Sequence, residues 1–364
     1  MIMVYDLGGG TFDVTIIRVD GGTIKVIATG GDHKLGGVDW DTALAEYMLV
    51  KYNEEHDTSY TLDSDDHLKN SLLLEAEQKK KILTAKSQVR ANVTFNGLST
   101  KVEITRELFD QLTEGKLNDT IDKTLELIEI SKGKDFEKID EVLLVGGSSR
   151  MPQIKKRIDA ELSEFGIAAR LDDPDECVAK GAAIFAINEA FAVAMDEYEN
   201  DDTGDAEKPK PISNSTRTRI VNVTSKTYGT DMSDGNGNTV VKNLIFANTA
   251  LPAKAIETFT TGADGQNAVP MKVYESDVTD PEQDKIIQER FADQLEDKEL
   301  LLSKWYPKGH PIQVVFEIDN EGILSVHAEV DEIDTIDFKL TIKGVKDEEQ
   351  LAAAQAEIEK LNVE

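Results

Sequence analysis

Short apolar runs alternate with glycine-rich turns at the start of the chain. The runs cover residues 2–5, 14–19 and 23–29, and they are separated by Gly8-Gly9-Gly10 and by Asp20-Gly21-Gly22. Apolar runs of this length between residues that favour tight turns predict β-strands. We therefore expect the chain to begin with three consecutive strands.

Helical spacing of apolar residues follows. Asp39 can cap a helix, whose apolar face is formed by Trp40, Ala43, Leu44, Tyr47 and Met48. Residues 66–84 and 106–131 show the same three- and four-residue spacing, which predicts two more helices. Between them, residues 91–105 predict a β-hairpin with Asn96-Gly97 in its turn.

A buried strand at residues 142–145 then leads through Gly146-Gly147 into a helix with Pro152 in its first turn. After a short strand near residues 167–171, Asp173 is expected to cap a last helix with Pro174 at its first position. The residues expected to be buried on this helix are Val178, Ala182 and Ala183. Residues 1–190 are therefore predicted to be an α/β domain.

The pattern changes twice in the second half. Residues 191–217 are acidic and then rich in proline and serine, which predicts a linker. Residues 218–345 contain short alternating strands with Asp, Asn and Gly at the turns, which is typical of a β-sandwich. Within them, residues 279–300 form a charged stretch whose composition is compatible with a helix. Residues 346–364 have a helix-forming composition, and we expect a helix to start there.

The composition limits the partners. The formal net charge is −30, which argues against nucleic acid or an anionic membrane surface. One cysteine, Cys177, excludes an intramolecular disulfide. Residues 181–195 are interrupted by Asn188 and Glu189, so we predict that they are too short and too polar to span a membrane. These features predict a cytoplasmic protein.

The loop from Asp6 to Thr11 carries the clearest candidate chemistry. Gly8, Gly9 and Gly10 can expose backbone N–H groups that bind phosphate. Asp6 would hold Mg²⁺, often through water, because it cannot bind phosphate directly. Thr11 offers a hydroxyl close to the terminal phosphate. The alternative is a glycine-rich hairpin with no ligand.

Three further segments have candidate ligand residues. Gly36-Gly37 precedes a predicted helix, where phosphate could bind, although a plain turn is the simpler interpretation. Gly146-Gly147 joins a strand to a helix, as in nucleotide sites. On the 66–84 helix, one side could hydrogen-bond a ribose or could simply be a solvated face. That side carries Glu77, Lys80, Lys81 and Thr84.

Four motifs together resemble the heat-shock protein 70 (DnaK-type) chaperone family. They are DLGGGTFDV at 6–14, LGGVDWD at 35–41, VLLVGGSSRMP at 142–152 and DPDECVAKGAA at 173–183. FTTGADGQNAV at 259–269 and VFEIDNEGILSV at 315–326 resemble the peptide-binding domain of the same family. The resemblance covers nearly the whole chain.

This resemblance implies an actin-like ATPase lobe that binds ATP or ADP with Mg²⁺. Asp6 would lie near the magnesium, and Thr11 would act in ATP hydrolysis. The nucleotide-binding residues that the resemblance implies are Gly8, Gly9, Gly10, Thr11, Gly37, Glu77, Lys80, Lys81, Thr84, Gly146, Gly147, Ser148, Arg150 and Asp175. Lys81 stands where many members have an arginine that stacks on the base, so base affinity is expected to be lower.

The chain also departs from the family pattern. The ligand loop begins at the sixth residue, and the first phosphate loop and its lysine region do not occur in the sequence. We therefore expect a partial nucleotide-binding domain without its first lobe, which puts ATP hydrolysis by this chain in doubt. The leucine-rich linker motif is replaced by Arg219-Ile220-Val221-Asn222.

The resemblance further implies a β-sandwich that binds extended hydrophobic segments of unfolded proteins. Met232, Phe259, Gly262 and Val269 would lie at the peptide pocket, although Phe259 and Val269 would also suit a sandwich core. The expected family partners are a J-domain co-chaperone and a nucleotide-exchange factor. The alternative is a truncated fragment that acts only as a peptide-binding module. Another actin-like ATPase, such as a sugar kinase, is less consistent with the second domain.

Overall fold

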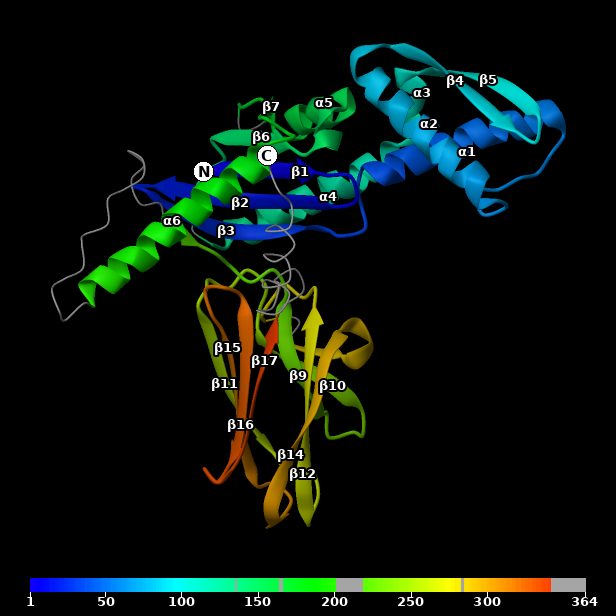
Figure 1. The fold of residues 1–364 in the computed structure, drawn as a ribbon. Coiled ribbons are helices and arrows are strands. Elements are labelled where there is room, and N and C mark those ends of the chain that lie inside the picture. Colours follow the sequence, from blue (N-terminus) through cyan, green and yellow to red (C-terminus); the bar gives the residue numbers. More distant parts are fainter. Residues whose placement is uncertain (135, 164–165, 201–218, 283–284, 342–364) are drawn as a thin grey trace, which may run out of the picture. The chain divides into compact units, whose positions relative to one another are not determined.

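The computed structural model describes residues 1–134, 136–163, 166–200, 219–282 and 285–341. The chain divides into two compact units, residues 1–220 and 221–364 (Figure 1). The expected linker at 191–217 and the helix expected from residue 346 lie largely or wholly outside the described residues.

A six-stranded sheet forms the base of the first unit. Its order is β7-β6-β1-β2-β3-β8, with β1 (Ile2–Leu7), β2 (Phe12–Asp20), β3 (Thr23–Asp32), β6 (Glu141–Val145), β7 (Arg170–Leu171) and β8 (Arg219–Val221). The first three strands are antiparallel, whereas β6 runs parallel to β1. Because β1 and β6 are parallel, their carboxyl ends lie at the same edge, which brings Gly8 and Gly146 together. The three predicted strands at the start are confirmed.

The remaining elements of this unit are helices and one hairpin. They are α1 (Gly37–His56), α2 (Asp66–Ala85), β4 (Gln88–Phe95), β5 (Leu98–Thr105), α3 (Arg106–Leu112), α4 (Glu114–Lys132), the 3-10 helix η1 (Gly147–Arg150), α5 (Pro152–Glu161) and α6 (Cys177–Glu199). Helices α1 and α2 pack on each other and on the hairpin, while α4 packs on β2 and β3 (Figure 1). The predicted Asn96-Gly97 turn is confirmed, with φ angles of 47° and 78°.

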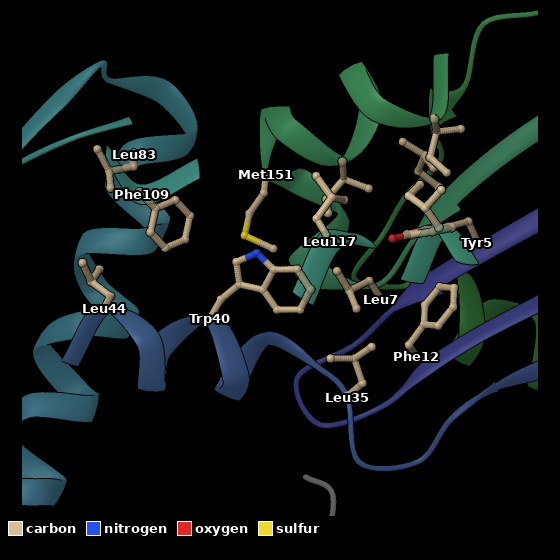
Figure 2. Packing of buried hydrophobic residues seen from close by; sticks show 14 of the residues in the cluster. Tyr5, Leu7, Phe12, Leu35, Trp40, Leu44, Leu83, Phe109, Leu117 and Met151 are labelled. Atoms are coloured by element: carbon tan, nitrogen blue, oxygen red, sulfur yellow. The ribbon is translucent and has the colours of Figure 1, made fainter. Parts of the chain in front are cut away.

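Trp40 connects the helical part of this unit to the sheet. Its side chain is fully buried, and Figure 2 shows its indole nitrogen turned toward the sulfur of Met151, with Leu7 nearby. Residues from the sheet, α1, α2, the hairpin, α4 and α5 belong to one continuous core. The site described below therefore rests on a single packed body.

Three sequence predictions for this unit are wrong in detail. Gly36, not Asp39, caps α1, and the Asp39 carboxylate accepts the Gly36 N–H at 2.8 Å from the third helical position. The helix expected at 106–131 is broken at Thr113 into α3 and α4. The predicted linker starts too early, because α6 continues to Glu199.

The last helix differs most from its prediction. It begins at Cys177 rather than at Pro174, and Val178, Ala182 and Ala183 are exposed rather than buried. Burial needs a neighbouring surface, and the described residues do not cover this helix. By length and composition alone, the segment Cys177–Met195 is long and apolar enough to cross a membrane. This differs from our expectation for residues 181–195, although one such helix is weak evidence for a membrane span.

The second unit contains two antiparallel sheets. One has the order β13-β10-β9-β12-β14 and the other β11-β15-β16-β17. The strands are β9 (Thr227–Ser233), β10 (Thr239–Ile245), β11 (Ala253–Thr260), β12 (Gln266–Ser276), β13 (Ile286–Gln288), β14 (Asp293–Tyr306), β15 (Pro311–Ile318), β16 (Ile323–Val330) and β17 (Asp334–Thr341). Buried residues from both sheets, such as Val273 and Phe316, form one core.

The charged stretch at 279–300 is not a long helix. It contains β13, the 3-10 helix η3 (Glu289–Phe291) and the first half of β14. Leu300 and Leu302 point into the core, while the residues between and before them are largely exposed. The alternation is visible only at the end of this strand, because its first half is exposed and charged.

Candidate functional site

The first unit contains a cavity of about 750 Å³, within the size range of small-molecule sites. Its walls come from the glycine loop, α1, α2, η1 and the turn before α6. It is lined by Gly9, Gly37, Val38, Asp41, Leu73, Leu74, Glu77, Lys80, Lys81, Thr84, Gly147, Ser148, Arg150, Met151 and Asp175. These include most of the predicted nucleotide-binding residues. The other predicted residues lie next to lining residues in the sequence but do not line the cavity. They are Gly8, Gly10, Thr11 and Gly146.

The glycine loop is fastened to the start of α1. The Gly37 N–H donates to the Gly8 carbonyl at 3.0 Å, and the Val38 N–H donates to the Gly9 carbonyl at 2.8 Å. The Gly8 N–H donates to the Thr11 carbonyl at 3.0 Å. The N–H groups at the start of α1 are thus already used, so phosphate binding there through Gly37 N–H would need these bonds to break.

A second close approach occurs at Gly37. A Cβ atom on this residue would lie 2.2 Å from Ser148 Oγ and 3.0 Å from Lys80 Nζ. Such distances are far below van der Waals contact, so only glycine fits here without movement of its neighbours. Three segments that are distant in sequence therefore meet at one point of the cavity wall.

Asp6 and Asp13 face each other across β1 and β2. Burial, and then the negative charge of Asp13, raise the pKa of Asp6. A pair of partly buried carboxylates that repel each other suits a cation, and Mg²⁺ commonly keeps several waters as ligands. The described residues contain no group of three or more candidate metal ligands, so these carboxylates could supply only part of a magnesium shell.

Gly146 closes the other side of this position. Its φ is 79°, and a Cβ atom on it would lie 2.4 Å from Asp6 Oδ1. Burial raises the pKa of Asp13, and His33 and then the side chain of exposed Thr11 oppose this shift in part. Thr11 is therefore beside the Asp6–Asp13 pair rather than in the main cavity.

The charged residues of the cavity are paired with each other. Lys80 Nζ lies 2.8 Å from Asp41 Oδ2, and Lys81 Nζ lies 2.6 Å from Glu77 Oε1. Arg150 forms an ion pair with Asp175. The Lys80–Asp41 pair is buried, whereas the other two pairs are largely exposed at the rim.

The sequence prediction missed five lining residues. Four are apolar, namely Val38, Leu73, Leu74 and Met151, and their apolar character gave no sign that they face a ligand. The fifth, Asp41, could have been noticed, because it is an acidic residue next to Trp40 on the apolar face of α1.

The second unit has a groove of about 800 Å³. All four predicted peptide-binding residues, Met232, Phe259, Gly262 and Val269, line it. Val269 is also part of the core, and Phe259 packs against it. The groove is therefore a hollow between strands of both sheets, lined by both apolar and polar side chains.

The prediction also missed Lys242, a cation in this groove. Its Nζ lies 2.7 Å from Glu257 Oε1 and 5.9 Å from the centroid of the Phe259 ring. The groove thus combines apolar side chains with a neutralised cation.

Two comparisons with known proteins bear on the family of this chain. The family model described as Hsp70 protein matches residues 1–364. The chain belongs to the Hsp70 family. It is 31% identical over 335 residues to the chaperone protein DnaK from each of two strains of Halobacterium salinarum, with 90% of this chain covered. The match covers 47% of these relatives, so the chain spans about half their length.

Proposed function

We propose that this chain is the nucleotide- and peptide-binding part of an ATP-dependent chaperone. The first unit would bind ATP or ADP with Mg²⁺ in the cavity, and the groove of the second unit would bind extended hydrophobic segments of unfolded proteins. The observation that carries the proposal is the convergence on one cavity of residues from the four family motifs of the first unit and from helix α2.

The residues of the first unit suit a nucleotide. Gly9 and Gly10 would hold phosphate oxygens through backbone N–H groups, since the Gly8 N–H is already used. Glu77, Lys80 and Thr84 on α2 would meet the adenosine. When bound, Mg·ATP supplies the γ-phosphoryl group that water attacks. Asp6 would orient the magnesium waters, and the Thr11 hydroxyl would act near the γ-phosphate.

The second unit suits an extended peptide. Backbone groups at the edge of the groove would bind the peptide main chain, and Val269 with Phe259 would contact one apolar side chain. The proposal includes two kinds of partner, a J-domain co-chaperone and a nucleotide-exchange factor, and a cytoplasmic location. Membership of the Hsp70 family is the only support for these three points.

Calorimetry tests the nucleotide half. We expect the 364-residue chain to bind Mg·ADP saturably with a Kd of about 100 μM or weaker, roughly 5 kcal/mol. Arg150→Gln should weaken binding about tenfold, about 1.4 kcal/mol. The matched control is Arg170→Gln, which removes an exposed arginine that pairs with Glu141 away from the cavity. No saturable binding, or equal losses in both variants, would reject the site.

A fluorescein-labelled, leucine-rich heptapeptide tests the peptide half. Its anisotropy should rise on titration with the chain, and a heptapeptide with serine at the leucine positions should not bind. Absence of binding by a folded chain would reject the groove as a peptide site.

A second candidate function is a peptide-binding module without ATP control. It is favoured by the internal ion pairs of Lys80, Lys81 and Arg150, because these cations are already neutralised. The two candidates differ in peptide release. ATP control predicts that adding Mg·ATP changes the dissociation rate of the heptapeptide, and the simple module predicts no change.

A further inference from the structure

Lys242 and Glu257 form an ion pair between the two sheets of the second unit. Lys242 lies opposite Thr230 in the pairing of β10 with β9, and Thr230 lies opposite the core residue Val273 of β12. Glu257 lies opposite the buried residue Val314 in the pairing of β11 with β15. Opposite residues on neighbouring strands share a face. Both charged side chains therefore occupy positions at which a sandwich normally has apolar residues.

Stability alone explains this pair poorly, because an ion pair between sheets is often no better than apolar residues of similar volume. The two partners also differ in where their surface is exposed. Lys242 lines the groove, whereas Glu257 does not. The side chain of Lys242 keeps 19% of its surface exposed, and the groove is the open space beside it. The ammonium is therefore accessible to a ligand in the groove.

Lys242 has hydrogen-bonding capacity that the protein does not use. A lysine ammonium has three N–H donors. Lys242 Nζ lies 2.7 Å from Glu257 Oε1 and 5.9 Å from the centroid of the Phe259 ring, and within the described ranges it has no further polar partner. At least one N–H is thus left for a bound ligand.

The charges around Lys242 limit what this N–H can bind. Glu257 already neutralises the ammonium, so a carboxylate in the ligand would add an unpaired negative charge, and a cation would be repelled by Lys242. A neutral oxygen acceptor avoids both costs. A leucine side chain would cover the ammonium without accepting a hydrogen bond, which leaves a donor unsatisfied. The groove therefore suits a side chain with an apolar stem and a neutral acceptor at its end.

We propose that Lys242 is a specificity-determining residue of the groove, which donates to the side-chain carbonyl oxygen of a glutamine at the centre of a bound, extended peptide. The methylene groups of that glutamine contact Phe259 and Val269, which line the same groove. This inference rests on the proposed peptide function and adds the identity of the preferred central side chain.

Two fluorescein-labelled heptapeptides test this preference, the leucine-rich one and the same peptide with glutamine at its central position. By anisotropy, the parent chain should bind the glutamine peptide about tenfold more tightly, as expected for one hydrogen bond to a charged donor. Lys242→Met keeps an unbranched apolar side chain without the donor, and it should bind the leucine peptide at least as tightly as the glutamine peptide.

The matched control is Lys254→Met. Lys254 is on β11 and forms an exposed ion pair with Glu317 outside the groove, so the tenfold preference should remain in this variant. Equal affinity of the parent for the two peptides would overturn the inference, and so would a preference for glutamine that persists in Lys242→Met.

Lysine labelling tests whether the peptide reaches Lys242. With an amine-reactive ester and peptide mass spectrometry, a saturating amount of the glutamine peptide should slow acylation of Lys242 at least about threefold, because the ammonium is then covered and hydrogen-bonded. Acylation of Lys254 should not change. An unchanged rate at Lys242 with bound peptide would overturn the inference.

These outcomes distinguish the two proposals. If a folded parent binds neither peptide, the groove fails as a peptide site and the inference fails with it. If the leucine peptide binds and the glutamine peptide binds no more tightly, only the inference fails. If Lys242→Met does not fold by circular dichroism, the double variant Lys242→Met with Glu257→Leu replaces it, because that variant leaves no unpaired charge. It should lose the preference for glutamine, and a retained preference would overturn the inference.

Discussion

Gly36 and Gly10 are in such close contact that no side chain fits between them. A Cβ atom on Gly36 would lie 2.5 Å from the carbonyl carbon of Gly10 and 2.6 Å from its Cα. The φ of Gly36 is −167°, an extended conformation that any residue adopts. Glycine is therefore required at position 36 for steric reasons. The close contact places the glycine loop against the first turn of α1.

Gly36→Ala should therefore destabilise the first unit. The added methyl group must push the loop and α1 apart, at a cost of about 1–3 kcal/mol. Urea unfolding followed by circular dichroism measures this. In the control Gly115→Ala, at the second position of α4, the new methyl group has no atom within 4 Å, so stability should not fall. Equal stability of Gly36→Ala and the parent would contradict the contact.

Arg106 holds the end of α2, which carries the predicted adenosine residues. Its guanidinium donates to the carbonyls of Leu83, Thr84 and Lys86 at 2.8, 3.2 and 3.0 Å. Arg106→Gln should loosen this end, because helix carbonyls at a C-terminus need partners. Hydrogen exchange of residues 82–86 should become faster. Arg90→Gln, which removes an exposed ion pair with Glu103, should leave the exchange of residues 82–86 unchanged. Equally fast exchange in both variants would contradict the role of Arg106 at the end of α2.

His327 should make the second unit less stable as the pH rises. The hydrogen bond to Asp337 raises the pKa of His327 above the ordinary value of 6.5. A raised pKa in the folded state stabilises the fold fully below the unfolded value, and this contribution is lost as the pH passes through the folded pKa.

Thermal unfolding at a pH below the unfolded pKa of His327 and at a pH above its folded pKa measures this loss of stability. The fall in Tm from about pH 6 to about pH 8.5 should be smaller in His327→Gln than in the parent. The control is His67→Gln, an exposed histidine on α2, which should behave like the parent. The same pH dependence in His327→Gln would contradict the role of this histidine.

Helix α6 should cause association of the chain. Its exposed large apolar residues include Val178, Ile184, Phe185, Ile187 and Val193, and exposed apolar side chains favour contacts between molecules. Light scattering after size exclusion should show a mass that increases with concentration. The double variant Ile184→Ser with Phe185→Ser should reduce this increase in mass. The control Val50→Ser, at an exposed valine on α1, should not. A parent that stays monomeric would contradict the prediction.

Val269→Phe should block peptide binding while the second unit stays folded. The larger ring would fill the groove that Val269 lines, at a strain of about 1–3 kcal/mol. Heptapeptide anisotropy measures binding, and circular dichroism measures folding. Ile256→Phe is the control, because Ile256 is exposed and outside the groove. If Val269→Phe binds as well as the parent, the peptide site lies elsewhere.

Local patterns in the sequence were sufficient for most elements. The strands at the start, α1, α2, the Asn96-Gly97 hairpin and β6 follow from spacing and turn residues within a few positions. The motifs also indicated most residues that line the cavity. These features are local, so the tertiary structure did not need to be known.

The errors occurred where a local pattern depends on distant neighbours. The spacing on α6 predicts an apolar face, but whether that face is buried depends on what packs against it. In β14, the charged residues hid a strand whose partner, β12, lies 20 or more residues earlier for most pairs. A strand is defined by its pairing partner, and composition alone cannot supply one.

By itself, the sequence determined most of the element types, the glycine positions and the family motifs, because these depend on backbone preferences and residue order. Only the tertiary structure decided that Gly37, Lys80 and Ser148 meet at one point and that Asp41 neutralises Lys80. Helices α1 and α2 pack side by side, which brings Asp41 and Lys80 to 2.8 Å although 39 positions separate them. The pairing of charges across that contact is a property of the packed fold.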